Sequence, residues 1–368
     1  MNLLTDPVPL AQVGRALVIK LRHHGDVLLA SPVIAALKSH APSIEIDALV
    51  YADTAPMLAL HPALEELHTI DRGWKELGAF PRAAAEWALF RRLAARRYDL
   101  LIQLSESWRG AWLARTLGAR WTVAPAHRRA STLWRNSFSH LVPSTRAGGR
   151  HAVESNLDAL RRIGIQPTEQ ERQLVLVPGD SAQRAIQALL SAHGLQAQSF
   201  VHVHPGSRWR FKCWTTAGWA EIIRRLQAAR WPVVLTAAPD ADELALTAAV
   251  QQQLVQPAID LSGRLGLKEI AALAGEARLF IGVDSAPMHI AAAMRTPAIA
   301  LFGPSGAELW GPWGTPRQGR HRVVASTRHS CRPCGLDGCG GGKVSDCLET
   351  LAAASVWHAV NEELQNPA

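Results

Sequence analysis

Cysteine and long uncharged apolar runs are both scarce in this 368-residue sequence. Five cysteines make no disulfide framework, and four of them lie within residues 331–347. No stretch approaches the roughly 18 apolar residues that a membrane-spanning helix needs. The first ten residues hold Asp6 and two prolines where a signal peptide has a basic cap and an apolar run. We therefore expect a protein that starts and stays in the cytoplasm.

Low-complexity tracts are absent as well, and the charged fraction is modest. With 48% hydrophobic and 19% charged residues, the chain can bury substantial cores, which excludes disordered, collagen-like and coiled-coil proteins. The length is too great for one ordinary core and suits two domains of about 150 to 200 residues each. The sequence thus predicts a globular protein with two domains.

The charge is basic and unevenly distributed. Of the net charge of +8, residues 1–150 carry +7, from 19 Lys and Arg against 12 Asp and Glu. Basic residues alternate with tryptophans here; they are Arg109, Arg115, Arg120, His127, Arg128, Arg129 and Arg135, with Trp108, Trp121 and Trp134. The pattern fits nucleic acid, scattered surface arginines, or an acceptor sugar bearing phosphates or carboxylates. We favour the acceptor, because arginines grip anions and indoles stack on sugar rings.

Short apolar runs alternate with amphipathic helical patterns in both halves, as in parallel sheets covered on both faces. The expected strands are 16–19, 44–50, 100–104, 121–124, 200–204, 233–236, 279–283 and 298–302. The expected helices are 81–97, 108–117, 154–163, 216–229, 240–250, 267–274 and 351–364. The pattern predicts an α/β protein with two Rossmann-like domains that face each other across a cleft.

Domain limits follow from a segment containing Pro, Gly and Gln that separates the halves. We expect a first domain over 1–175, a second over 176–350, and a last helix, 351–368, that returns to the first domain. Ligands of such sheets bind beyond the carboxyl ends of the strands.

A polar motif, Lys20-Leu21-Arg22-His23-His24-Gly25-Asp26, follows the first expected strand directly. Asp26 stands where a helix begins, so it is either a helix cap or a general base at the floor of the cleft. No GxGxxG follows this strand, which disfavours a dinucleotide site. Pro32 is expected to bend the helix or to delay its regular start to about Ser31.

The second half opens with His204-Pro205-Gly206-Ser207, then Lys212-Cys213-Trp214 before a helix. A strand that runs into a Gly-Ser turn and a lysine supplies backbone donors, a hydroxyl and an ammonium, a set that suits a diphosphate. The bland alternative is a turn with a solvated lysine. The GK[ST] spacing is missing, so this is not a P-loop NTPase.

Two further strand ends carry polar residues. Asp240 follows one of them and could lie near a ribose. The other runs Gly282-Val283-Asp284-Ser285-Ala286-Pro287-Met288-His289, and small residues there let a phosphate approach a helix start. His289 is either a buried helix histidine or a residue that faces substrate.

The clustered cysteines have the spacing Cys331-x2-Cys334-x4-Cys339-x7-Cys347. They lack the paired CxxC knuckles of a zinc ribbon, and the surrounding loop is rich in glycine. Structural zinc, a labile disulfide and plain free thiols all remain open, with free thiols favoured. We expect no catalysis by these thiols.

Taken together, these motifs resemble the ADP-heptose:lipopolysaccharide heptosyltransferases of glycosyltransferase family 9, over about residues 15–307. Segments that most resemble the type III enzymes are Lys20-x-Arg22-x-His24-Gly25-Asp26, Trp134-Arg135-x-Ser137-Phe138-x-His140, Glu154-Ser155-Asn156-Leu157 and Phe211-Lys212-Cys213-Trp214. The resemblance implies a GT-B fold and an inverting transfer of L-glycero-D-manno-heptose from ADP-heptose to the inner core of lipopolysaccharide. For type III, this is the third heptose, placed on heptose II.

The resemblance also implies a role for each matching residue, with no metal or other cofactor required. In the first domain, which would bind the acceptor, Asp26 would be the catalytic base. The expected acceptor-binding residues are Lys20, Arg22, His24, Gly25, Arg128, Arg129 and Arg135. In the second domain, Lys212 would act in catalysis and donor binding. The other expected donor-binding residues are Gly206, Ser207, Asp240 at the ribose, Leu265 against adenine, Asp284 at the heptose, Ser285, Ala286 and His289.

Two other functions compete with this interpretation: a glycosyltransferase of the same fold that uses another nucleotide sugar, and a basic nucleic-acid-binding protein. A nicotinamide-dependent oxidoreductase is disfavoured because the fingerprint is missing. The partners implied by the resemblance are ADP-heptose, the lipopolysaccharide inner core and the inner-leaflet membrane surface, with no nucleic acid. The basic first half suits a peripheral position on the cytoplasmic face of the inner membrane.

Overall fold

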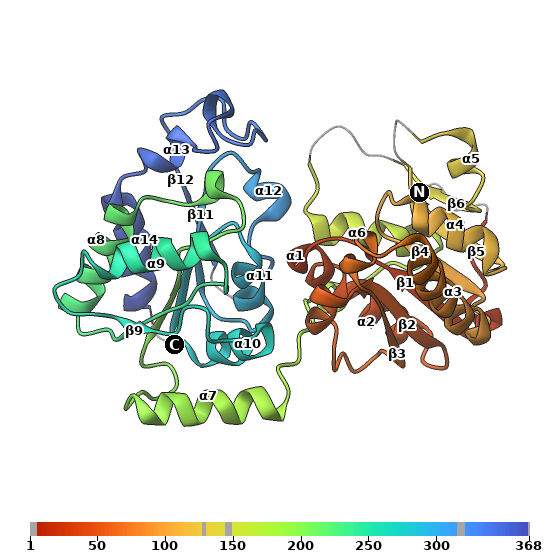
Figure 1. Cartoon of the computed structure of the whole chain (residues 1–368), viewed down its shortest axis with the longest axis horizontal. Helices are drawn as coiled ribbons and strands as arrows, with labels where there is room; N and C mark the ends of the chain where they lie inside the picture. The colour runs from red at the N-terminus through yellow and green to blue at the C-terminus, as the bar shows by residue number, and fades with distance from the viewer. Residues whose placement is uncertain (1–5, 127–129, 144–148, 315–320, 367–368) are drawn as a thin grey trace. The chain divides into compact units, whose positions relative to one another are not determined.

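The computed structural model describes residues 6–126, 130–143, 149–314 and 321–366. The chain splits into two compact units, Met1–Val175 and Leu176–Ala368 (Figure 1). Each unit has its own parallel sheet with helices packed on it. Within the described ranges, no helix combines the length and the apolar character needed to cross a membrane.

The first unit is built on a parallel sheet of six strands in the order β3-β2-β1-β4-β5-β6. The strands are β1 (Arg15–Ile19), β2 (Glu45–Tyr51), β3 (Glu66–Ile70), β4 (Leu100–Gln103), β5 (Trp121–Pro125) and β6 (His140–Val142). Four of them were expected from their apolar runs. The sequence did not predict β3 and β6, because these edge strands are only partly buried and carry polar residues.

Helices of the first unit are α1 (His24–Leu28), α2 (Ser31–His40), α3 (Ala79–Arg96), α4 (Trp108–Thr116), α5 (Thr132–Arg135) and α6 (Ala152–Arg162). Pro32 stands in the first turn of α2, where its missing N–H costs no helical hydrogen bond. The expected restart of the helix at Ser31 is thus confirmed. The core between sheet and helices includes Leu17, Ile19 and Leu101 on strands and Leu93 on α3.

The second unit repeats this plan, with the strand order β12-β11-β10-β7-β8-β9. Its strands are β7 (Val201–His204), β8 (Val233–Leu235), β9 (Ile259–Asp260), β10 (Leu279–Val283), β11 (Ala298–Phe302) and β12 (His321–Ala325). The four central strands were expected. Strands β9 and β12 were not, since they form the edges and one has only two residues.

Helices of the second unit are α7 (Asp180–Ala192), α8 (Thr216–Ala228), α9 (Ala241–Gln251), α10 (Leu267–Glu276), α11 (Ala286–Ala293), α12 (Ala307–Trp310), α13 (Asp346–Glu349) and α14 (Ala353–Gln365). Helix α7 was not predicted. It follows the Pro-Gly-Asp break directly and buries Ala182, Ile186 and Leu190, a spacing of four residues that is typical of one helix face.

The last helix was expected to pack back on the first domain; the structure shows its contacts within the second unit. Helix α14 packs on α8 and β12 of the second unit. Val356 and Val360 lie in the core there, and the Trp214 indole N–H donates to the carbonyl of Leu351, 3.1 Å away. The physical reason is that the apolar face of α14 shares one core with buried side chains of α8, β7 and β10.

Both sheets therefore have the doubly wound order in which the first and fourth strands are neighbours. In the first unit these strands are β1 and β4, and in the second they are β7 and β10. Crossovers leave in opposite directions at this point, so the loops beyond the two strands diverge and leave room for a ligand. Any binding site in either unit is expected at these carboxyl ends.

Candidate active site

Each unit has a lysine at the point where its crossovers diverge. Lys20 follows β1 and reaches the end of β4, where its ammonium donates to the carbonyl of Leu104 at 2.9 Å. Lys212 follows β7 and reaches the end of β10, where its ammonium lies 2.7 Å from a carboxylate oxygen of Asp284. The sequence named all of these residues except Leu104, and the sheet order explains why each lysine meets the fourth strand.

Lys20 is buried, with 8% of its surface exposed. Its ammonium also donates to the side-chain oxygen of Asn156 on α6, at 2.9 Å. Burial lowers the pKa of Lys20 to about 8, against the opposing influence of the nearby Asp26 carboxylate. Lys20 is thus a mainly positive group near Asp26 at neutral pH.

Asp26 lies in the first turn of α1 and is partly exposed. The helix cap is His23, so the alternative interpretation of Asp26 as a cap is wrong. No hydrogen bond or ion pair to another described residue engages its carboxylate. A partly exposed carboxylate beside a buried lysine, at the carboxyl end of the first strand, is available to accept a proton.

The loop around Asp26 is held by Asp53 and Arg72, two residues that were not predicted from the sequence. His24 shares a hydrogen bond with the carbonyl of Asp53, 3.0 Å away. Arg72 binds the Asp53 carboxylate at 3.0 Å and the carbonyl of Arg22 at 2.9 Å. The Arg22 side chain is exposed to solvent, while its backbone carbonyl is held by Arg72. Only the folding of β2 and β3 beside β1 reveals these contacts.

The structure describes only one of the three arginines of the basic stretch that were expected to bind the acceptor. Arg128 and Arg129 lie outside the described residues. Arg135, at the end of α5, is exposed. Arg115 from the same basic stretch instead supports the fold, since its guanidinium binds the Ser137 hydroxyl and the Leu133 carbonyl.

In the second unit, the turn after β7 is shaped by an acidic residue that the sequence analysis did not single out. A Cβ atom on Gly206 would lie 2.5 Å from a carboxylate oxygen of Glu243, so only glycine fits. Glu243 comes from α9, is 7% exposed, and accepts a hydrogen bond from the Ala238 amide at 3.0 Å. Its other neighbour is His204, 3.4 Å away. Glu243 therefore supports the Gly206-Ser207 turn from below.

The protonation of Glu243 next to this turn depends on its neighbours, His204 among them. Burial acts to raise the pKa of Glu243, but His204, the Ala238 amide and the charge of Arg208 together outweigh it and leave this pKa below its ordinary value. Ser207 is 9% exposed, and its hydroxyl accepts from the Trp209 amide at 3.4 Å. The turn is thus supported by the Ser207 hydroxyl and by the close approach of Glu243 to Gly206.

The Lys212–Asp284 pair joins the loops beyond β7 and β10. Lys212 ends a short 3-10 helix, Arg210–Lys212, and is partly exposed, whereas the Asp284 side chain is 7% exposed. Because Asp284 directly follows β10 and is buried, it fixes where the ammonium lies. The ion pair with Asp284 thus orients the Lys212 ammonium at the strand ends.

Helix α11 starts at the same edge of the sheet. Its first residues, Ala286 and Pro287, follow Ser285, whose hydroxyl is buried and has no hydrogen-bond partner among the described residues. The amides that open a helix have no partner within it, and the helix dipole is positive there. His289 is 4% exposed on the next turn and faces the interior. These groups form an arrangement that suits an anion.

The remaining donor-site candidates lie on neighbouring elements. Asp240 caps α9, and its Oδ1 accepts from the amides of Asp242 and Glu243 at 3.1 and 3.4 Å. The other carboxylate oxygen forms no hydrogen bond to another described residue. Leu265, between β9 and α10, is partly buried against the core of Ile186 and Leu273. Its packing leaves only part of the side chain to meet a ligand.

All five cysteines are free thiols. Cys331, Cys334 and Cys339 are exposed, while Cys347 is buried at the start of α13. Burial, together with the three neighbouring thiols, raises the pKa of Cys347. Burial also raises the pKa of Cys213 to about 11, which excludes a reactive thiolate beside Lys212.

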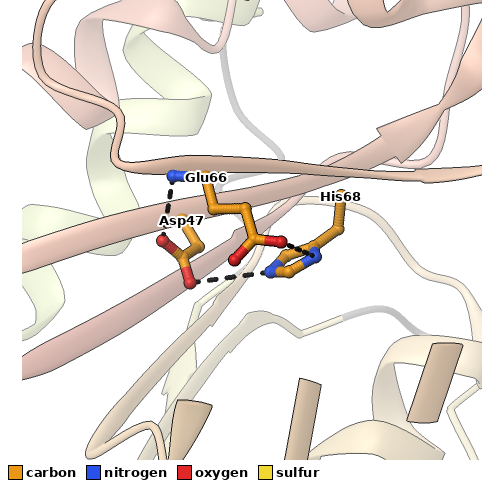
Figure 2. A group of neighbouring side chains, drawn as sticks. All are labelled: Asp47, Glu66 and His68. Carbon is orange, nitrogen blue, oxygen red and sulfur yellow. Dashed lines mark hydrogen bonds and ion pairs between the residues drawn. The ribbon is translucent and has the colours of Figure 1, made fainter. Parts of the chain in front are cut away.

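Three potential metal ligands, Asp47, Glu66 and His68, lie within 4.8 Å of one another, and among the described residues they alone form such a group (Figure 2). Arg96 already occupies this place, with its guanidinium 2.7 Å from Asp47 and 3.8 Å from Glu66. Tyr98 also donates to Asp47, at 2.7 Å. The group stands at the amino-terminal end of the sheet, away from the ligand edge. It is a charge network in which Asp47 is buried and Glu66 is exposed.

Comparisons with known sequences find relatives of this chain. Residues 86–339 match glycosyltransferase family 9 (heptosyltransferase). The chain is 39% identical to the Escherichia coli protein "Lipopolysaccharide heptosyltransferase 3" over 295 residues, which cover 80% of this chain and 84% of that one.

Solved structures of the family share the fold. A glycosyl transferase family 9 protein from Veillonella parvula superposes with a TM-score of 0.80 at 22% identity, over 95% of this chain and 97% of that one. The E. coli heptosyltransferase WaaC with ADP-2-deoxy-2-fluoro heptose superposes with a TM-score of 0.71 at 20% identity, over 95% and 99% of the two chains. The expected GT-B class is confirmed. The chain belongs to glycosyltransferase family 9, the heptosyltransferases, and is a glycosyltransferase.

Proposed function

We propose that this enzyme transfers L-glycero-D-manno-heptose from ADP-heptose to the inner core of lipopolysaccharide, as the third heptose, onto heptose II. The observation that carries the proposal is the 39% identity to an E. coli lipopolysaccharide heptosyltransferase 3, which extends over 80% of the chain. The residues at the ends of β1, β7 and β10 support it, because they supply a carboxylate for the acceptor and cationic groups for a diphosphate.

Donor binding is assigned to the second unit. The Lys212 ammonium, the backbone of Gly206-Ser207 and the first amides of α11 all lie beyond the ends of β7 and β10. The diphosphate of ADP-heptose would be held by these groups, with the unpartnered Ser285 hydroxyl as a further donor. The small side chain of Ala286 lets a phosphate approach the helix closely.

The rest of the donor is assigned to neighbouring residues. The Asp240 oxygen that α9 does not use accepts from a ribose hydroxyl, and Leu265 packs against adenine. Asp284 contacts the heptose with the carboxylate that also orients Lys212. His289, buried on α11, supports this wall of the site.

The reaction needs a base for the acceptor and stabilisation for the leaving group. In this proposal Asp26 accepts the proton of the acceptor hydroxyl as that oxygen bonds to the anomeric carbon of the heptose. The bond from this carbon to the donor phosphate breaks on the opposite face, so the configuration inverts. The negative charge of the departing ADP is stabilised by Lys212 and the α11 amides. No step requires a metal ion.

The acceptor is assigned to the first unit. Lys20 lies beneath the Asp26 loop, and Arg22, His24 and Gly25 belong to it. Arg128, Arg129 and Arg135 would meet the anionic groups of the inner core. Because that acceptor is a membrane glycolipid, the enzyme works at the cytoplasmic face of the inner membrane, where the basic first unit meets anionic lipid.

Mass spectrometry of the reaction product tests the proposal. The purified chain is incubated with ADP-heptose and lipopolysaccharide that lacks the third heptose, and the expected product is heavier by one heptose unit. Parallel reactions replace the donor with ADP-glucose or UDP-glucose. Transfer from these donors but not from ADP-heptose would refute the assigned donor.

A binding titration separates this function from its rival. ADP is expected to bind in the absence of metal, and single-stranded DNA is expected not to bind at moderate salt. Tight DNA binding with a steep salt dependence and no ADP binding would favour the nucleic-acid function instead.

A further inference from the structure

The outer surface of α3 and α4 carries large aromatic side chains that the reaction does not use. Phe80 and Trp87 on α3 are 90% and 59% exposed, and Trp108 and Trp112 on α4 are 58% and 50% exposed. We call these four residues, with the half-buried Phe90, the aromatic surface. Isolated apolar side chains on a surface are ordinary, but adjacent ones mark a place of interaction.

Ring contacts make this surface continuous across the two helices, which lie side by side (Figure 1). The ring of Phe90 lies 5.5 Å from that of Trp87 and 5.4 Å from that of Trp112, measured between centroids. Phe90 thus joins α3 to α4. Trp108 precedes Trp112 by one helical turn and extends the row along α4.

Helix α3 has apolar residues on two opposite faces. Its inner face buries Leu89 and Leu93 in the core of the unit. Its outer face carries Phe80, Ala84, Trp87, Ala88 and Arg91, all exposed. The outer side of an ordinary surface helix is polar, so this face is built for an environment other than water.

The charges of α3 and α4 are predominantly positive. Within α3 the charged residues are Arg82, Glu86, Arg91, Arg92 and Arg96, and within α4 they are Arg109 and Arg115. The one acidic residue of the two helices, Glu86, is paired with Arg109 at 2.6 Å. Exposed Arg82, Arg91 and Arg92 therefore present uncompensated positive charge beside exposed indole and phenyl rings.

We propose that the aromatic surface of α3 and α4 docks the enzyme on an anionic lipid bilayer. Indole rings insert at the level of the headgroups, and the arginines bind lipid phosphates. A bilayer needs no shape complementarity, which suits a helical face with small alanines between its aromatic side chains. The inference deepens the proposed function, since it names the surface by which the enzyme reaches a membrane acceptor.

Sedimentation with vesicles tests the docking without any substrate. The full chain is mixed with vesicles of phosphatidylethanolamine and phosphatidylglycerol, or of phosphatidylcholine alone. It is expected to bind the anionic vesicles and to be released from them by high salt. Variants R91E/R92E and W87S/W112S should each weaken this binding about tenfold or more.

The control variants change one exposed charge and one exposed apolar side chain outside the aromatic surface. R184E reverses an exposed charge on α7, and V255S removes an apolar side chain that is 97% exposed; both should bind vesicles like the parent. Circular dichroism and thermal melting of every variant exclude unfolding as the cause of weaker binding. Vesicle binding by R91E/R92E and W87S/W112S equal to that of the parent overturns the proposal.

A second copy of the chain is the alternative occupant of this face. Sedimentation equilibrium without lipid should show the same molecular mass for the parent and for W87S/W112S. A larger assembly that W87S/W112S dissociates overturns lipid docking in favour of self-association.

Two acceptors separate this inference from the proposed reaction. On a water-soluble core oligosaccharide that lacks lipid, W87S/W112S should transfer heptose at the parental rate. On lipopolysaccharide embedded in anionic vesicles, its rate should fall. If the parent transfers heptose to neither acceptor but still binds vesicles, the proposed function fails and the docking surface stands.

Discussion

The Lys212 ammonium lies 2.7 Å from the Asp284 carboxylate, which joins the loops beyond β7 and β10 although the two residues are 72 positions apart. This pair stands where the crossovers of the second sheet diverge, the place where doubly wound proteins bind ligands. The contact gives the proposed diphosphate site a preset charge. Substitution of either residue therefore tests whether this site binds the diphosphate.

We expect Lys212→Ala to weaken ADP binding about tenfold or more and to slow turnover, because a charge-assisted contact to the diphosphate is lost. Isothermal titration with ADP and steady-state kinetics measure both effects. Lys343→Ala, which removes an exposed lysine paired with the exposed Asp337, is the control and should leave ADP binding unchanged.

The coupling between Lys212 and Asp284 can be measured with Asp284→Ala and the double variant. If Asp284 acts partly by orienting Lys212, the double variant loses less ADP affinity than the two single losses added together. Strictly additive losses would show that the ion pair has no part in binding the diphosphate.

Asp26→Asn is expected to lower the turnover number by about 10² to 10⁴ while ADP affinity stays at the parental level, because only the general base is lost. Glu65→Gln, a change of an exposed carboxylate in the same unit, is the control for rate and stability. Near-parental turnover by Asp26→Asn would show that another group accepts the proton.

Gly206→Ala is expected to weaken ADP binding and to lower the melting temperature, at a cost of about 1 to 3 kcal/mol in the free energy of unfolding. The new Cβ would meet the Glu243 carboxylate at 2.5 Å, and His204 and the Ala238 amide hold that carboxylate in place. Glu243→Ala in the same chain should recover part of the loss, since it removes the clash. A double variant as unstable as the sum of the single variants would contradict this explanation.

Acid sensitivity should depend on Asp47. Burial acts to raise the pKa of Asp47, but hydrogen bonds from His68, Arg96 and Tyr98 lower it to about 2, from an ordinary 3.8. Because the folded pKa is the lower one, the network contributes its full stability above pH 3.8 and loses it as the pH falls towards 2. The contribution is about 2 kcal/mol.

Urea unfolding between pH 3 and pH 6 compares the parent with Asp47→Asn and with the exposed control Glu65→Gln. Asp47→Asn should be less stable near pH 6, and its disadvantage should shrink as the solution becomes more acidic. Added Zn²⁺ should not raise the melting temperature, since Arg96 fills the space between Asp47 and Glu66. Stabilisation by Zn²⁺ that Asp47→Asn abolishes would instead identify a metal site.

Sequence patterns located the central strands and most helices because buried runs and amphipathic spacing are local properties. The same apolar runs predicted where β1, β7 and β10 end. The polar residues that follow these ends along the chain are Lys20, Asp26, Lys212 and Asp284. Edge strands such as β3 and β9 were missed, since a strand that is half exposed or two residues long has no distinctive apolar run. Glu243 was missed because nothing near it in the sequence distinguishes a buried glutamate from an exposed one.

The sequence by itself determined the residue types available at each strand end, the alternation that builds two parallel sheets, and the excess of basic residues in the first half. The tertiary structure decided which of those residues meet: Lys20 with Asn156, Lys212 with Asp284, Glu243 beneath Gly206, and α14 on α8. The physical reason is that these contacts join residues far apart along the chain. Their partners are chosen by strand order and by the core that each helix completes, and local periodicity carries no record of either.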